Sequence, residues 1–220
     1  MEKIVVANKP RGQTSYQVVR EFKRQYPGQK VGHAGTLDPL AEGVLIILIG
    51  KATKRQSEFM GLEKEYLVDL LFGKVSPSLD LEFEPEPYRV DDLGNRLKKL
   101  NRGAVEKALK QFEGEIDQVV PAFSAIKKDG QRLYKLARQQ KVSVSDLPER
   151  KVMVKEIRLV DFVSGKWPTA RISMRVSKGT YVRSIVRDLG ESLGVGAVTT
   201  RLIRTRIGDF KIDPHTSENQ

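Results

Sequence analysis

Apolar residues follow a strand-like pattern in six segments, where they either alternate with polar residues or form short uninterrupted runs. The predicted strands are residues 4–7, 44–49, 65–72, 151–163, 170–176 and 197–207. Residues 44–49 are aliphatic throughout and lie between two glycines, which is typical of a strand buried on both faces. In the segment 151–163, the alternation slips near Glu156, which predicts a β-bulge.

Four other segments carry apolar residues three or four positions apart, and this spacing predicts amphipathic helices. The helices are expected at about residues 15–26, 104–112, 131–140 and 181–193. Thr14 or Ser15 can cap the first helix, and Pro27 ends it. Strands and helices do not alternate strictly along the chain, so the pattern favours the α+β class.

Three segments show neither pattern. Residues 29–43 are rich in glycine and are expected to form a polar loop. Residues 76–96 combine acidic residues with three prolines, which predicts an exposed loop or mobile insertion and not a linker between two folded halves. Residues 213–220 are polar and are expected to form a flexible tail, so one domain is predicted over residues 1–212.

Composition narrows the class of function. The 220 residues include no cysteine and two histidines, which excludes disulfides, thiolate chemistry and a metal site built from Cys or several His ligands. No apolar run is long enough to span a bilayer or to form a signal peptide, so a cytoplasmic protein without membrane contact is expected. The net charge of +11 suits a nucleic-acid partner, although a generally basic surface would give the same charge.

The loop that leads into the buried strand 44–49 carries the clearest candidate for chemistry. Its glycines permit positive φ and a close approach of backbone to a ligand. Pro39 follows Asp38 directly and biases Asp38 away from helical conformation. A carboxylate is thus expected in a tight loop, where it could act on a substrate or, as is common for an Asp-Pro pair, only cap a turn.

The sequence from Gly32 to Leu45, GHAGTLDPLAEGVL, resembles the catalytic motif of the TruB family of pseudouridine synthases. Further blocks resemble the other family motifs in the same order. They are NKPRGQTS at 8–15, EKEY at 63–66 with FG at 72–73, PAFSAIK at 121–127 with the residues up to 138, KGTYVRS at 178–184, and Leu202, Arg204, Thr205, Gly208 and Phe210. The resemblance covers about residues 3–212, nearly the whole chain.

The resemblance implies the pseudouridine synthase fold, a mixed, mostly antiparallel sheet with flanking helices and a central RNA-binding cleft. It also implies isomerisation of uridine to pseudouridine in RNA, and for bacterial members the target is the T-loop uridine at tRNA position 55. The expected partner is therefore the T arm of tRNA, bound by a monomer that needs no obligate protein partner. Because nothing is oxidised and no phosphate is consumed in this isomerisation, no cofactor and no metal are expected.

The resemblance also implies three catalytic roles. Asp38 would act at C1′ of the flipped uridine, Arg183 would pair with Asp38 and keep it ionised, and Tyr66 would stack on the base. A carboxylate suits this chemistry because it can attack or stabilise a cationic anomeric carbon, as in glycosidases. Either a C1′ adduct or a glycal intermediate fits these residues. Without the motif, Tyr66 would be read as a core aromatic and Arg183 as part of a solvated helix face.

A second group of residues is expected to bind substrate RNA or to shape the site. It comprises Lys9, His33, Gly35, Thr36, Lys127, Arg132, Tyr181, Leu202 and Arg204. Such contacts, together with stacking, can offset the few kcal/mol that base flipping costs. Lys9 could instead organise the catalytic loop, and His33 could be a structural loop residue.

The sequence departs from the family pattern at a few positions. Asn8 replaces the usual Asp, Val120 replaces the first of two prolines, and Phe123 replaces the usual Tyr. No PUA domain is expected after the catalytic domain, which leaves RNA affinity and target choice more open. Three alternatives therefore remain: a synthase for another RNA uridine, a non-catalytic tRNA chaperone, and a nucleoside hydrolase, which would release free uracil.

Overall fold

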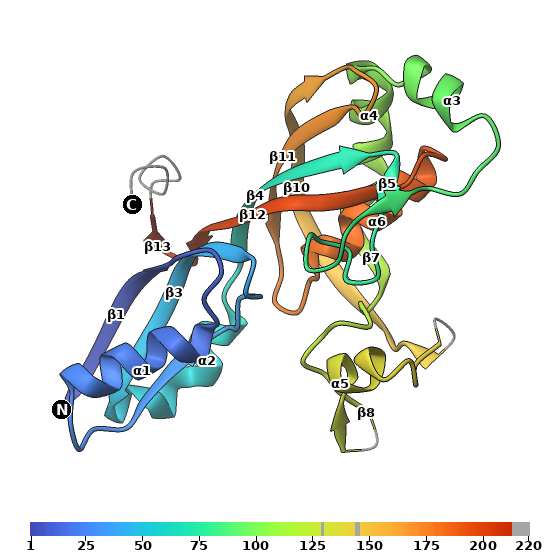
Figure 1. Ribbon diagram of the computed structural model, residues 1–220. Coiled ribbons are helices and arrows are strands. Elements are labelled where there is room, and N and C mark those ends of the chain that lie inside the picture. Colours follow the sequence, from blue (N-terminus) through green and yellow to red (C-terminus); the bar gives the residue numbers. More distant parts are fainter. Residues whose placement is uncertain (129, 144–145, 213–220) are drawn as a thin grey trace. The chain divides into compact units, whose positions relative to one another are not determined.

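The computed structural model describes residues 1–128, 130–143 and 146–212, and its chain divides into two compact units (Figure 1). The first unit comprises Met1–Leu67, Met174–Lys178 and the chain from Arg201, and the second comprises Val68–Ser173 and Gly179–Thr200. Three strands, β4, β11 and β12, have residues in both units. The expected tail, residues 213–220, lies outside the described residues, and the prediction of one domain over residues 1–212 stays a prediction.

The first unit contains the N-terminal elements of the chain. They are β1 (Glu2–Lys9), α1 (Ser15–Gln25), β2 (Val31–Ala34), β3 (Ala41–Gly50), the 3-10 helix η1 (Lys51–Arg55), α2 (Gln56–Gly61) and β13 (Phe210–Lys211). The strands shared with the second unit are β4 (Lys64–Phe72), β11 (Thr169–Val176) and β12 (Ala197–Ile207).

The second unit contains the middle of the chain and one late helix. Its elements are β5 (Lys74–Val75), β6 (Glu86–Pro87), α3 (Leu93–Lys99), α4 (Arg102–Leu109), the 3-10 helix η2 (Lys110–Phe112), β7 (Gly114–Val119), β8 (Lys127–Lys128), β9 (Gln131–Arg132), α5 (Leu133–Arg138), β10 (Glu149–Val163) and α6 (Val182–Ser192).

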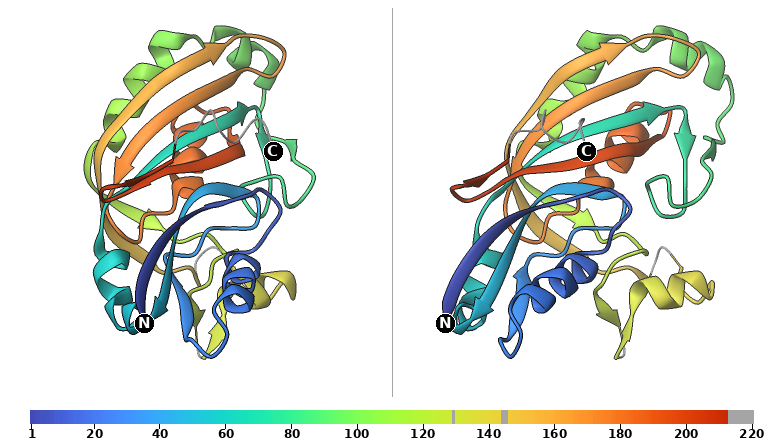
Figure 2. Two further views of the ribbon diagram at one scale, coloured as in Figure 1. Left: turned by 90° about the vertical axis from the view of Figure 1, so that its left-hand side faces the viewer. Right: turned by 60° about the vertical axis from the view of Figure 1, so that its left-hand side comes forward.

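Strand β3 is buried along almost its whole length because helices cover both of its faces. Leu45, Ile47 and Ile49 pack with α1, whereas Val44, Ile46 and Leu48 pack with Phe59 of α2. Two views show the helices on opposite sides of this strand (Figure 2). The uninterrupted aliphatic run in the sequence is the consequence, since neither face of the strand can be polar.

Helix α1 begins where its sequence predicts. Thr14 accepts a hydrogen bond from the backbone N–H of Gln17, and the Gln17 side chain accepts one from the Thr14 backbone N–H, which forms a capping box. Val18 and Val19 are buried against β3. The helix therefore holds a fixed position on the sheet of the first unit.

The sheet of the first unit is mixed. Strand β3 pairs antiparallel with β1, with Val5 opposite Ile47, and antiparallel with β2, with Ala34 opposite Ile46. It pairs parallel with β12, with Leu202 opposite Ala41. The loop between β2 and β3 thus connects two strands that pair with each other.

The strand order in the second unit is β12-β4-β11-β10-β7, and β10 and β7 pair antiparallel. In β11 the alternate residues Ala170, Ile172 and Met174 are buried, as expected for a strand with one face in the core. In β10 the buried positions change from even to odd numbers between Val154 and Ile157, which agrees with the predicted slip near Glu156.

All six predicted strands and all four predicted helices are present in these units, with somewhat different bounds. The prediction of a loop throughout residues 29–43 was wrong, because Val31–Ala34 forms β2 and β3 already begins at Ala41. The short elements α2, α3 and β7 were not predicted. Within the described residues, no helix is both long and apolar enough to cross a membrane.

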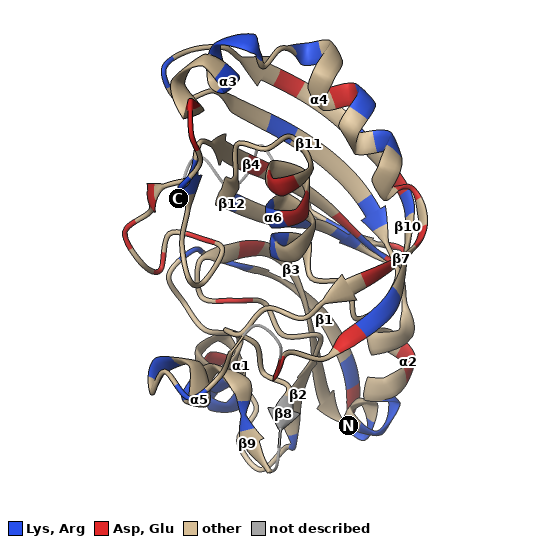
Figure 3. Ribbon diagram, turned by 90° about the vertical axis from the view of Figure 1, so that its right-hand side faces the viewer, with Lys and Arg blue, Asp and Glu red and all other residues tan. Residues whose placement is uncertain are grey.

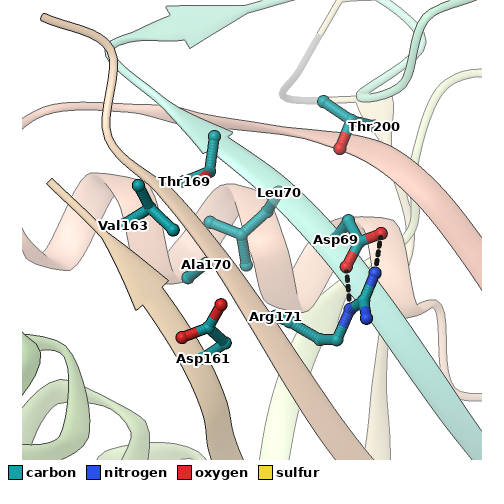
Figure 4. A pocket seen from close by; sticks show the side chains of 8 residues that line it. All are labelled: Asp69, Leu70, Asp161, Val163, Thr169, Ala170, Arg171 and Thr200. Carbon is teal, nitrogen blue, oxygen red and sulfur yellow. Dashed lines mark hydrogen bonds and ion pairs between the residues drawn. The ribbon is translucent and has the colours of Figure 1, made fainter. Parts of the chain in front are cut away.

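A hollow of about 340 Å³ lies on the sheet of the second unit (Figure 4). Asp69, Thr169, Arg171, Thr200 and Asp161 line it, and Arg171 forms a two-pronged ion pair with Asp69, with Nε–Oδ1 and Nη2–Oδ2 distances of 2.6 and 3.0 Å. None of the site residues predicted from the sequence lines this hollow, so it is separate from the candidate active site.

Candidate active site

The loop that carries Asp38 is fixed by the residues around the start of α1. The Ser15 hydroxyl accepts a hydrogen bond from the Leu37 N–H at 2.9 Å and donates one to the Leu37 carbonyl at 3.1 Å. The Gly12 N–H donates to the Pro39 carbonyl at 2.8 Å. The backbone is therefore held on both sides of Asp38, which is itself half-buried.

Lys9 reinforces the same loop from inside the first unit. Its side chain is completely buried, and its Nζ donates to the carbonyls of Gln13, Pro10 and Pro39 at 2.6, 2.9 and 3.2 Å. These three bonds use every N–H of an ammonium group. This arrangement supports the alternative in which Lys9 organises the loop.

Arg204 holds the opposite end of the loop. It is almost completely buried, and its guanidinium donates to the carbonyls of Val44 at 2.8 Å and Gly35 at 2.9 Å. Its own backbone pairs with Gly43, whose φ is +103° and whose added Cβ would lie 2.3 Å from the Arg204 carbonyl oxygen. Glycine is required at 43 because β12 passes too closely for any side chain.

Burial and the neighbouring charges shift the pKa values of two residues at this loop, Lys9 and His33. Burial lowers the pKa of Lys9 to about 8, even though the carboxylates of Asp38 and Glu42 act in the opposite direction; Arg204 lowers it further. Burial, and then the Arg204 charge, also lower the pKa of His33, so its imidazole is uncharged at neutral pH. His33 can therefore offer RNA a hydrogen bond but not an ionic contact. Among the described residues its buried Nδ1 has no hydrogen-bond partner.

Tyr66 lies in β4, in the part of the strand that belongs to the first unit, and is half-buried. Lys64 is two positions earlier and therefore on the same face of the strand. The Lys64 Nζ donates to the carbonyls of Met60, at 2.7 Å, and Leu62, at the end of α2. Lys64 thereby anchors the start of the strand that carries Tyr66.

Burial, followed by the nearby charges of Arg204 and Lys178, lowers the pKa of Lys64 to about 8, against 10.5 for an ordinary lysine. Between these two pH values Lys64 is protonated in the unfolded chain but largely deprotonated in the folded one. Its contribution to the free energy of unfolding therefore rises with pH. We expect the stability of the wild type relative to Lys64→Met to increase by up to about 3 kcal/mol between pH 8 and 10.5.

Denaturant unfolding at a series of pH values measures this change. The exposed Lys107→Met variant controls for the loss of a lysine and is expected to keep a constant difference from the wild type. If the free energy of unfolding of the wild type, relative to that of Lys64→Met, stays constant or falls between pH 8 and 10.5, the assignment of Lys64 as a buried cation is contradicted.

Arg183 belongs to α6 in the second unit, and its guanidinium is buried. It donates to the carbonyls of Ser78 and of Phe123, the latter at 3.0 Å, and lies 3.6 Å from the Asp80 carboxylate. Asp80 in turn accepts from the Ser78 hydroxyl at 2.6 Å and from the Glu82 N–H at 3.0 Å. The orientation of Arg183 is therefore determined by a buried polar network, and the reading of a solvated helix face is wrong.

Sequence reasoning missed Asp80 and Ser78 as partners of Arg183. It treated residues 76–96 as an exposed acidic loop, and residues 81–84 are indeed exposed. Ser76, Ser78 and Asp80, however, are buried. The sequence shows no periodic pattern at these positions, because the three residues form local hydrogen bonds in a loop and do not belong to the apolar face of a helix or strand.

The remaining predicted RNA contacts are distributed over both units. In the first unit, Thr36 is exposed, Gly35 has a φ of +95°, and Leu202 is buried beside Ala41. In the second unit, Tyr181 exchanges two hydrogen bonds with the Gln118 side chain.

Two predicted contacts lie near helix α5 of the second unit. Arg132 is exposed and lies immediately before this helix. Lys127 lies in β8, and its side chain is outside the described part of the structure. The roles of all these residues stay predictions.

The arrangement of the first unit thus gathers Asp38, Lys9, His33, Gly35 and Arg204 around one loop. It offers a carboxylate on a backbone that two buried cations, Lys9 and Arg204, hold through its carbonyls. Such a carboxylate is suited to act on a developing positive charge in a substrate, because little reorganisation is needed when the substrate binds.

Comparison with known sequences places this chain among RNA-modifying proteins. A family model described as "TruB family pseudouridylate synthase (N terminal domain)" matches residues 23–182. A protein of Bacteroides fragilis named "tRNA pseudouridine synthase B" is 44% identical over 217 residues, with 96% of this chain and 88% of the relative covered. A protein of the same name from Fusobacterium nucleatum is 39% identical over 213 residues, with 97% and 70% covered.

Solved structures agree with these sequence matches. A chain of the "Crystal Structure of a Cbf5-Nop10-Gar1 Complex" aligns with a TM-score of 0.69 and 28% identity, covering 96% of this chain and 50% of that chain. A chain of the "Structure of H/ACA RNP bound to a substrate RNA containing 2'-deoxyuridine" gives 0.66 and 27%, covering 96% and 49%. The present chain thus spans about half the length of these solved chains. The likeness confirms the predicted α+β fold with a mixed, mostly antiparallel sheet.

Proposed function

Because the chain belongs to the TruB family of pseudouridylate synthases, we propose that it isomerises uridine to pseudouridine in tRNA, with Asp38 as the catalytic carboxylate. The observation that carries this proposal is the fixed position of Asp38. The side chains of Ser15, Lys9 and Arg204 hold its loop through hydrogen bonds to the loop backbone. The names of the relatives support tRNA as the substrate.

The reaction rearranges bonds within one nucleotide. The N1–C1′ bond breaks, the uracil turns, and a C5–C1′ bond forms; the C5 proton is lost and N1 gains a proton. Positive charge develops at C1′ when the uracil leaves. The Asp38 carboxylate would stabilise this charge or bond to C1′ directly, as carboxylates do at the anomeric carbon of sugars.

The proposal gives the other predicted residues supporting roles. Tyr66 would stack on the flipped base, for which an aromatic ring on an anchored strand is suited. Arg183 would pair with Asp38 during catalysis and keep it ionised. The network of Ser78, Asp80 and the Phe123 carbonyl supports a positioned role for Arg183, because a buried guanidinium with several acceptors has one preferred orientation.

The T arm is proposed as the part of tRNA that carries the target, with the T-loop uridine as the modified nucleotide. This choice rests on the motif resemblance, and a monomer is expected to suffice for it. A base in a loop costs less to extrude than a paired base, which favours a loop as the target.

The test is to incubate the purified protein with an unmodified tRNA transcript and to map pseudouridine by carbodiimide treatment and primer extension. We expect one new stop in the T loop, and the same product from an isolated T-arm stem-loop. A transcript with cytidine in place of the T-loop uridine is the matched control and should give no stop. Salt-sensitive tRNA binding without any stop would instead favour the chaperone alternative, and free uracil would favour a nucleoside hydrolase.

A further inference from the structure

The solvent-facing side of α1 carries an exposed aromatic residue and three cations. Tyr16, Arg20, Lys23 and Arg24, the α1 stripe, are all exposed. Arg20, Lys23 and Arg24 follow Tyr16 by four, seven and eight residues, which brings all four to the exposed side of the helix, whereas Val18 and Val19 are buried against the sheet. The Lys23 ammonium lies 5.5 Å from the centre of the Tyr16 ring, so these two side chains form one continuous surface.

The three cations of the α1 stripe differ from most arginines elsewhere in the described chain, which form ion pairs with carboxylates. In the described part of the chain, none of the three forms an ion pair with a carboxylate. Arg201 and Arg206, for example, pair with Glu42 and Glu65, each at 2.6 Å.

Helix α4 shows the usual arrangement for comparison. Arg102 and Glu106 form an ion pair there, and basic and acidic residues both occur along the helix (Figure 3). Helix α1 contains a single acidic residue, Glu21, which follows Arg20 directly. The stripe therefore keeps a net positive charge that is available to a partner.

The stripe begins beside the catalytic loop. Ser15, whose hydroxyl is bonded to the Leu37 backbone, directly precedes Tyr16. At a rise of about 1.5 Å per residue, Arg24 lies about 13 Å along the helix from Ser15. Phosphates of a stacked nucleic-acid strand are about 3.4 Å apart along its axis, so the stripe is long enough to contact several in succession.

We propose that the α1 stripe is a binding track for the RNA backbone next to the target nucleotide. Its cations would contact phosphates on one side of the uridine that Asp38 attacks, and Tyr16 would offer a face for stacking of an unpaired base. The inference rests on the proposed function, since it takes the substrate to be RNA. It adds a specific surface on α1 to the contacts predicted from the sequence on other elements, such as Arg204 in β12 and Lys127 in β8.

An RNA partner fits this surface better than an acidic protein segment. The cations of the α1 stripe lie in a row that starts at the loop proposed to act on a nucleotide. An RNA strand bound at this loop extends beyond the target nucleotide, and its next phosphates can reach the stripe. Exposed tyrosine beside cations is the combination that single-stranded nucleic-acid sites use for stacking and backbone contact.

The test compares two charge-reversed proteins of identical net charge. The first variant combines Arg20→Glu, Lys23→Glu and Arg24→Glu. The control combines Lys98→Glu, Lys99→Glu and Lys107→Glu, three exposed cations on α3 and α4 of the second unit. Because the two variants carry the same total charge, a difference between them reports the local contribution of the α1 stripe. Circular dichroism and thermal unfolding verify that both proteins are folded.

Binding to an unmodified tRNA transcript is measured at several salt concentrations. We expect the α1 variant to bind at least about tenfold more weakly than the control at about 0.1 M salt, with the slope of log K against log salt smaller by about two. Replacing the three cations by glutamine should give a smaller effect in the same direction. Equal affinities and equal slopes for the two glutamate variants would overturn the proposal.

Failure of this inference is distinguishable from failure of the proposed function. The salt dependence is a binding measurement and can be carried out without turnover. If the wild type forms pseudouridine but the two variants bind alike, the α1 stripe is wrong and the function stands. If the wild type forms none, the function is wrong, and a slope difference on tRNA still reports whether α1 contacts the RNA.

Discussion

The Asp38→Asn variant is expected to form no measurable pseudouridine, a loss of at least about four orders of magnitude in kcat, which is the scale seen when a catalytic nucleophile is removed. Asparagine has nearly the same volume as aspartate but carries no negative charge, so it can neither bond to C1′ nor stabilise positive charge there. The loop should keep its shape because Ser15, Gly12, Lys9 and Arg204 hold its backbone through hydrogen bonds.

Single-turnover kinetics on an unmodified tRNA transcript measures this loss, and filter binding verifies that the variant still binds tRNA. Asp91→Asn is a matched control, since it makes the same chemical change at an exposed aspartate of the second unit. Asp38→Asn activity within tenfold of the wild type would show that another group performs the chemistry, and the proposed mechanism would have to be abandoned.

Asp80→Asn is expected to lower kcat by about two to three orders of magnitude while tRNA affinity changes little, since Asp80 acts through Arg183 and not on the RNA. The asparagine can keep the bonds from the Ser78 hydroxyl and the Glu82 N–H. It removes the charge that faces the buried guanidinium, 3.6 Å away. An arginine that loses its buried counter-charge is free to turn toward other acceptors, and stability should also fall by about 3 kcal/mol.

The control for this prediction comes from the same acidic segment. Glu86 forms an exposed ion pair with Arg89 at 3.5 Å, and Glu86→Gln should change both kcat and stability very little. The decisive readout is the division between kcat and affinity. If Asp80→Asn lowers only the thermal stability and leaves kcat intact, Asp80 is a structural residue and does not position Arg183 for catalysis.

Local sequence patterns were sufficient for most secondary structure. The alternation in 170–176 and the aliphatic run in 44–49 reappear as β11 and as the centre of β3, because burial of one or two strand faces imposes those patterns directly. Of the two predicted candidates, Thr14 and Ser15, it is Thr14 that caps α1, and such a cap can be predicted because it depends only on residues within one turn. Short elements such as β2 escaped prediction, because glycine and polar residues form a strand there only through pairing with β3.

The candidate for chemistry follows from the sequence alone. The motif around Asp38 indicates the family, and the comparisons confirm that family. This was feasible because a catalytic loop is a continuous stretch of residues whose order must match the chemistry. The assignment of roles to Asp38, Tyr66 and Arg183 rests on the same motifs and awaits the experiments above.

The position of each charged residue in the fold, in contrast, cannot be read from the sequence. Lys9, Arg204, Arg206 and Arg20 are equivalent in a charge count. The first two support the catalytic loop from inside, the third pairs with Glu65, and the fourth is exposed and forms no ion pair with a carboxylate of the described residues. Asp80 is likewise one of several acidic residues in its segment, and contact with Arg183 sets it apart. The physical reason is that burial and ion pairing depend on residues distant in sequence, which local patterns do not record.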